Sequence, residues 1–138
     1  KPSELRVESI SLRYINAIEL DYENNSVSEF LKDNLKVSVS LPSNLFQNTE
    51  VEPLPRHFQL QQWYRTTKPK GIIQLSISTG RKSNKLALIW DTTVKSAGDD
   101  LPNMSDGFEN WLDQAHTLAY DWFFKMIEGK LHKEFANE

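Results

Sequence analysis

Residues 108–135, FENWLDQAHTLAYDWFFKMIEGKLHKEF, are the stretch that decides the fold. Apolar side chains recur in it at intervals of three and four residues, which is the spacing of one face of an α-helix. The residues on this face are Phe108, Trp111, Leu112, Ala115, Leu118, Ala119, Trp122 and Met126. The pattern predicts one amphipathic helix of roughly 40 Å, at about 1.5 Å per residue. Its apolar face needs an extended surface to cover it, which the preceding residues must supply.

Segments that alternate between apolar and polar residues precede this helix and predict β-strands. In the first segment Leu12 and Ile18 point to one side of the strand, while Arg13 points to the other. The turns at residues 68–71 and 80–85 are rich in glycine, proline, serine or asparagine and predict consecutive hairpins. We expect strands at residues 6–20, 36–41, 57–66, 72–79 and 86–94.

A short helix is expected between the first two strands. Ser26 can cap its first turn, and the apolar residues at positions 27, 30, 31 and 35 would share one face. Ser105 or Asp106 can cap the long helix in the same way. Residues 45–55 hold two prolines and read as an irregular loop.

This order of elements is typical of an α+β fold. We expect an antiparallel sheet of about five strands, with one short helix and a long C-terminal helix packed on one face. An antiparallel sheet can leave its other face in water. If the sheet curls around the long helix, the arrangement is similar to the helix-grip fold of START-type ligand-binding domains.

The chain of 138 residues is the ordinary size of one domain, and we expect residues 1–138 to form a single unit. Its 16 basic and 19 acidic side chains are scattered and give a net charge of −3, so a nucleic-acid binder is disfavoured. The chain has no cysteine, which excludes disulfides, thiolate nucleophiles and cysteine-bound metals. This composition suits a reducing cytoplasm.

Membrane insertion is not expected, because no apolar stretch approaches the ~20 residues that a membrane helix needs. The N-terminus, Lys1-Pro2-Ser3-Glu4, has no signal-peptide pattern and no initiating methionine. We therefore expect the C-terminal domain of a longer protein.

Histidines are the first candidates for acid-base or metal chemistry. His57, His116 and His132 do not form a metal-ligand spacing, and no P-loop, dinucleotide or GxSxG motif occurs. We therefore predict no metal, no cofactor and no catalytic residue. His116 stands out because Tyr120 lies one helical turn further on, although the edge of a buried stripe would explain it equally well.

Three polar residues in predicted strands are further candidates. Asn16 shares the apolar side of the first strand with Tyr14, where a buried amide would need partners. Arg13 lies on the opposite side, where it can bind an anion or pair with a carboxylate such as Asp91 or Glu19. A purely structural role, in which the arginine stem covers an exposed sheet face, is the simpler interpretation.

Surface-facing aromatic residues are the last signal. Trp63 lies opposite the apolar side of its strand, and Phe123 and Phe124 widen the apolar side of the long helix. Such residues mark either a partner surface or a second layer of packing.

Two segments together resemble a known family. Residues 12–18, LRYINAI, and residues 111–116, WLDQAH, followed by Phe123, Phe124 and Leu131, look like the C-terminal half of an uncharacterised, sporadically distributed bacterial protein family. Members carry an LRYIN-type strand, a late strand with an LxWD segment, here residues 88–91, and a closing LxxxH helix. The resemblance implies no activity. The positions that match its pattern are Arg13, Tyr14, Asn16, Asp91 and His116.

Three hypotheses about function remain. The first is a non-catalytic domain that binds a protein partner or a second copy of itself through the long helix and the exposed aromatic residues. The second is a small-molecule binding domain, in which sheet and helix enclose an apolar cavity with Asn16, Tyr14 or His116 as polar anchors. The third is an enzyme, which requires Arg13, Asp91 and His116 to converge in one cleft.

Overall fold

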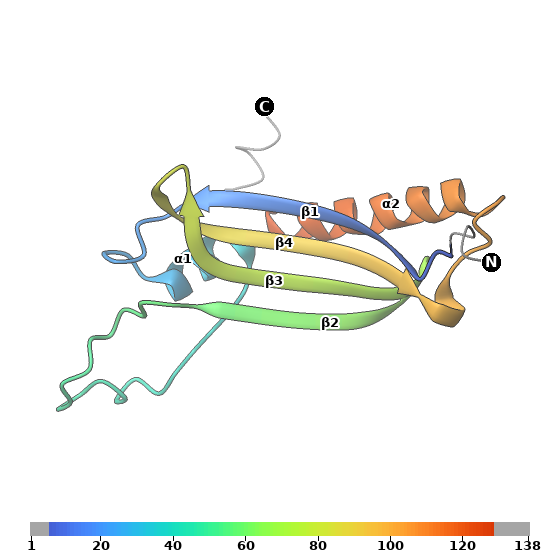
Figure 1. Ribbon diagram of the computed structural model, residues 1–138. Coiled ribbons are helices and arrows are strands. Elements are labelled where there is room, and N and C mark those ends of the chain that lie inside the picture. The colour runs from blue at the N-terminus through green and yellow to red at the C-terminus, as the bar shows by residue number, and fades with distance from the viewer. Residues whose placement is uncertain (1–5, 129–138) are drawn as a thin grey trace.

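The computed structural model describes residues 6–128 and shows an α+β fold with two layers (Figure 1). One layer is a four-stranded antiparallel sheet, and the other is formed by two helices that lie on the same face of it. We call the face that the helices cover the inner face, and the opposite one the outer face. In chain order the elements are β1 (Ser9–Glu19), α1 (Val27–Leu35), β2 (Gln59–Thr67), β3 (Lys70–Lys82), β4 (Lys85–Ala97), a 3-10 turn (Gly98–Asp100) and α2 (Phe108–Met126).

The strand order across the sheet is β1-β4-β3-β2, so β1 and β2 form the two edges. The β3–β4 hairpin turns at Ser83 and Asn84, whose φ angles of 49° and 68° suit a two-residue loop between twisted strands. This tight turn makes both strands longer than the sequence predicts. The first strand joins β4 rather than its neighbour in sequence, with Asn16 opposite Trp90.

One segment that we predicted as a strand is not one. Residues 36–41 lie outside every strand, and the sheet in the described part of the chain therefore has four strands instead of about five. Lys36 ends α1 in the left-handed conformation, with a φ of 57°. Val37 and Val39 then pack beneath α1 against the core. The alternation of apolar residues in this segment therefore reflects contact with the core. It does not reflect a strand, because no described strand lies beside the segment to form backbone hydrogen bonds with it.

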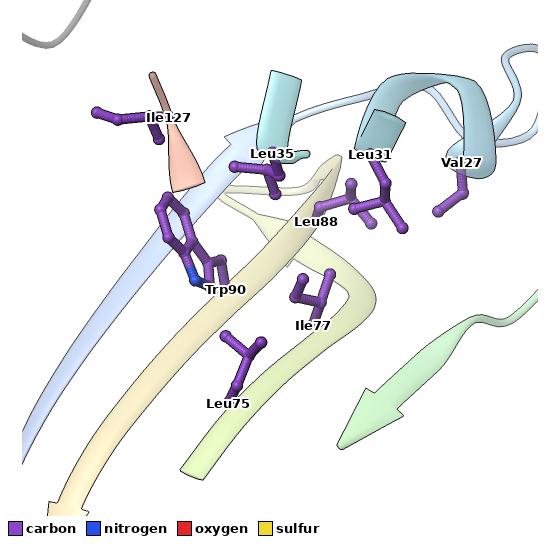
Figure 2. Close-up of a cluster of buried hydrophobic side chains, with 8 residues drawn as sticks. All are labelled: Val27, Leu31, Leu35, Leu75, Ile77, Leu88, Trp90 and Ile127. Carbon is purple, nitrogen blue, oxygen red and sulfur yellow. The ribbon is translucent and has the colours of Figure 1, made fainter. Parts of the chain in front are cut away.

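The short helix α1 forms as predicted. The Ser26 side chain accepts a hydrogen bond from the Glu29 backbone N–H at 3.2 Å and so caps the first turn. Val27, Leu31 and Leu35 are buried on one face of the helix. Figure 2 shows these three side chains over the inner face of β3 and β4, where they meet Leu75, Ile77, Leu88, Trp90 and Ile127.

The long helix α2 forms, with three differences from prediction. The helix ends at Met126 with Ile127 as its C-cap, so the prediction of a continuous helix to Phe135 is wrong at residues 127–128, and the predicted portion beyond residue 128 lies outside the described residues. Gly107 is its N-cap, without a side-chain bond, because the turn formed by residues 103–107 displaces Ser105 and Asp106. Leu112 is 39% exposed instead of buried, because it lies at the margin of the side that α2 turns toward the sheet. The buried residues on that side are Trp111, Ala115 and Ala119, which pack with Ile73 of β3 and Val94 of β4.

Candidate functional site

A cleft of about 250 Å³ opens where α2 crosses the edge strand β1. We call it the edge cleft. Its lining is mostly aromatic, and four of the six residues are ones that the sequence singled out. They are Tyr14 and Asn16 from β1, and Ala119, Tyr120, Phe123 and Phe124 from α2.

Local periodicity brings these residues together. Tyr14 and Asn16 are two residues apart and point to the inner face of β1, as alternation in a strand requires. The four α2 residues form two pairs that are four residues apart, 119 with 123 and 120 with 124, so their side chains lie along one strip of the helix. Ala119 is 1% exposed, and its small side chain lets α2 approach β1 closely. Tyr120 stands at the rim and is 56% exposed.

Aromatic rings form a continuous series along the cleft. Tyr120 and Phe124 lie with ring centroids 4.4 Å apart, and Phe123 contacts Phe124 edge-on at 5.1 Å. Phe123 also stacks on Trp90, nearly parallel, at 4.8 Å. Such pairs contribute roughly 0.5–1.5 kcal/mol each beyond the area they bury. The series ties the cleft wall to the core.

A polar pair closes one end of this series. The hydroxyl of Tyr14 is hydrogen-bonded to Nδ1 of His116, across the gap between β1 and α2. The His116 ring also lies 5.9 Å from that of Tyr120. His116 therefore holds Tyr14 in place beside the cleft, which is a positioning role for the histidine that the sequence singled out.

Trp90 contacts two of the cleft residues from the core side. It is opposite Asn16 in the β1–β4 register and stacks on Phe123. Its indole Nε1 is buried and has no hydrogen-bond partner within the described part of the chain. An unsatisfied buried donor of this kind costs roughly 1–3 kcal/mol.

The remaining predicted site residues lie on the outer face, away from the edge cleft. Nε of Arg13 donates to Asp91 Oδ2 at 2.8 Å, and Nη2 bonds the same oxygen. The pairing of Arg13 with Asp91 was one of the alternatives that the sequence left open. The hydrogen bond to Asp91, together with its negative charge, raises the pKa of the Arg13 guanidinium. Trp63 is 60% exposed on β2, at the far edge of the sheet.

These positions argue against the third hypothesis, an enzyme. An enzyme built on Arg13, Asp91 and His116 needs the three side chains in one cleft, and the sheet separates the first two from the third. Residues 6–128 contain no group of three histidine, aspartate, glutamate or cysteine side chains that could hold a metal ion. No helix in the same range is long and apolar enough to cross a membrane. His132 lies outside the described residues.

The sequence did not lead us to predict one residue of the edge cleft, Tyr120, or a second hollow elsewhere in the molecule. Tyr120 is a principal cleft residue, and its signal was available, since it lies four residues after His116 and four before Phe124. A larger hollow of about 580 Å³ lies beneath the irregular segment after α1, with Phe46 and Phe58 among its lining residues. Unlike the edge cleft, it depends on a loop instead of on two regular elements.

Comparison with known proteins gives one match. The chain is 28% identical, over 131 residues, to endo-1,4-beta-xylanase A of Thermotoga maritima. The match covers 91% of this chain, which spans 11% of the length of that curated relative. No family model and no solved structure matches the chain.

Proposed function

We propose that the chain is a non-catalytic interaction domain whose contact surface is the edge cleft. The observation that carries the proposal is the convergence of four aromatic side chains and one amide on a strand edge. Tyr14 and Tyr120 are 36% and 56% exposed there, although large aromatic side chains are costly to leave in water. Aromatic residues are enriched at protein interfaces for the same reason.

The separation of the charged pair from the cleft also supports this proposal. Arg13 and Asp91 satisfy each other on the outer face, and none of the described residues that line the edge cleft is ionised. A surface of this composition favours a partner that presents apolar and hydrogen-bonding groups, and it offers no general acid or base beyond the paired His116.

A small-molecule site in the same cleft is the second candidate, and the lining favours it, because aromatic side chains surround a few polar groups. The cleft volume of about 250 Å³ lies below the 300–1,000 Å³ that is typical of pockets for drug-sized ligands, so the ligand would be small, with a single aromatic ring. Asn16 and the Tyr14 hydroxyl would orient it. In this case the sheet and α2 would act in a helix-grip-like manner, a comparison supported by the position of α2 against one face of the sheet.

The family resemblance remains part of the proposal. The LRYIN residues form the middle of β1, and the LxWD segment lies in β4 beside it. Both segments therefore border the edge cleft or pack directly behind it, as expected if this pattern marks a shared binding surface. The cysteine-free composition supports a cytoplasmic location within the same proposal.

Two-dimensional NMR distinguishes the two candidates. Self-association predicts that the amide signals of Tyr14, Asn16 and Tyr120 shift with protein concentration alone. A small-molecule site predicts saturable shifts of the same signals on titration with indole, at any protein concentration. Tyr120→Ser should abolish either response, and Trp63→Ser is the control, because Trp63 is an aromatic residue that is 60% exposed on the outer face of the far edge strand. Shifts confined to other surfaces in both titrations contradict the proposal.

A further inference from the structure

Within the part of the chain that the structure describes, one side of the edge strand β1 has backbone groups that no other strand pairs with. The Leu20 N–H donates to the Leu86 carbonyl at 3.1 Å, so Leu20 and Leu86 form a hydrogen-bonded pair of the β1–β4 ladder. Because such pairs alternate along an antiparallel ladder, the even-numbered residues of β1 bond to β4. The odd-numbered residues, Arg13, Ile15 and Ala17 among them, turn their N–H and C=O groups away from the sheet. No strand pairs with them within residues 6–128.

This edge lacks most of the usual protection against pairing. Natural edge strands are commonly short or carry charged side chains, lysine above all, proline or a bulge, and the charged residues of β1 are Arg13 and Glu19. β1 runs for 11 residues, SISLRYINAIE, contains neither lysine nor proline, and keeps an unbroken register with β4. Ile15 on its outer face is 55% exposed. The strand is therefore a ready template for another strand.

The sequence of β1 is complementary to itself in one antiparallel register. When two copies pair with Asn16 opposite the partner's Asn16, Arg13 faces the partner's Glu19, and symmetry makes this ion pair twice. Ile15 then faces the partner's Ala17, and both are odd-numbered residues whose free backbone groups can complete the ladder. Centring the pairing on Arg13 would instead oppose two arginines, and centring it on Ala17 would place Ile15 opposite a glutamate.

The edge cleft lies on the same edge. A two-fold axis through Asn16 brings each copy's exposed Tyr14 and Tyr120 next to the same surface of the other copy, on the inner face of a continuous sheet. Interfaces of this symmetry are self-complementary by construction. A single dimer interface would thus bury both the exposed aromatic residues and the backbone groups of the strand edge.

We propose that this chain forms a two-fold symmetric dimer by antiparallel pairing of β1 with β1 of a second copy, with Asn16 on the axis. The inference rests on the proposed function, since it names the partner of the same surface. Arginine has five N–H donors, and Asp91 engages those on Nε and Nη2. The guanidinium can therefore keep its internal partner while it meets the partner's Glu19.

Cross-linking tests the register directly, because the full chain has no cysteine of its own. In this register Asn16 is a non-hydrogen-bonded pair with itself, with Cα atoms about 4.5 Å apart, which is within disulfide range. Under mild oxidation Asn16→Cys should form a covalent dimer at least about tenfold faster than Arg65→Cys on the opposite edge strand. Equal rates, or faster cross-linking of Arg65→Cys, would overturn the proposal.

Charge exchange provides a second test that does not depend on oxidation. Glu19→Arg opposes arginines in the proposed dimer, and Arg13→Glu opposes glutamates, so each variant alone should sediment as a monomer at concentrations where the wild type dimerises. Mixed together, the two should form a heterodimer in which both ion pairs are restored. A mixture that stays monomeric while the wild type dimerises refutes the register.

A proline substitution separates dimerisation from folding. Ile15→Pro removes an N–H that points away from β4, so it costs the monomer no ladder bond while it blocks the intermolecular one. It should raise the dimer dissociation constant at least tenfold, with helical circular dichroism retained. If the wild type is a monomer at every concentration yet indole shifts the cleft signals, the dimer proposal fails and the proposed binding function stands. If neither is seen, both fail.

Discussion

Ser96→Ala should show how α2 is held on the sheet. Ser96 lies on β4, is 1% exposed and joins two elements through its hydroxyl. The hydroxyl donates to the Lys70 carbonyl at the start of β3, at 2.5 Å, and accepts from Nε1 of Trp111 on α2, at 2.9 Å. Trp111 is itself only 3% exposed, so water cannot replace the lost acceptor.

The expected cost follows from the two groups left without their partner. The Trp111 N–H is a buried donor, whose loss of a partner costs about 1–3 kcal/mol, and the lost hydrogen bond to the carbonyl of the exposed Lys70 adds about 1 kcal/mol. Together they predict a loss of about 3 kcal/mol in the free energy of unfolding. The alanine methyl group fits the space of the serine, so no cavity adds to this value. For a chain of this size the loss corresponds to a fall of about 10 °C in Tm.

Urea denaturation followed by far-ultraviolet circular dichroism measures this loss. Ser78→Ala is the matched control, because Ser78 is a half-buried serine on the outer face of β3. Trp111→Phe removes the same donor from the other side, and the double variant should be less damaging than the sum of the two by about 1–2 kcal/mol. A Ser96→Ala loss no larger than that of Ser78→Ala, or strict additivity, would refute this account.

Three further substitutions have definite expectations. Gly71→Ala should cost about 3 kcal/mol in unfolding free energy, because a Cβ there would lie 2.2 Å from the Lys95 carbonyl oxygen, and the same denaturation assay would show it. Trp90→Phe should change stability by less than about 1 kcal/mol, since it removes an unsatisfied N–H, whereas Trp90→Ala should cost about 4 kcal/mol; equal losses would contradict this. Tyr14→Phe should shift the tautomer ratio of His116, measured by long-range ¹⁵N NMR, because the hydroxyl that bonds Nδ1 is gone; an unchanged ratio would contradict the bond.

Much of the secondary structure follows from the sequence because its causes are local. The capping of α1 by Ser26 involves atoms three residues apart, and the turn at Ser83 and Asn84 involves residues that tolerate positive φ. The amphipathic face of α2 is likewise a property of one element. The sequence predicted the pairing of Arg13 with Asp91 only as one of several alternatives. Alternation along a strand shows on which face of the sheet a side chain lies, but it does not show which strand lies beside it.

What only the tertiary structure decided depends on which distant segments meet. β1 joins β4, some 78 residues away at the Arg13–Asp91 pair, and this non-local pairing makes β1 an edge. The same geometry leaves Leu112 exposed and residues 36–41 unpaired, although both carry the pattern of buried elements. The sequence by itself indicated a helix that begins at Phe108, with its apolar stripe, and the structure set its end at Met126. The sheet decided how much of that stripe is core, and that its far end, at Phe123 and Phe124, meets Tyr14 and Asn16 at an open edge.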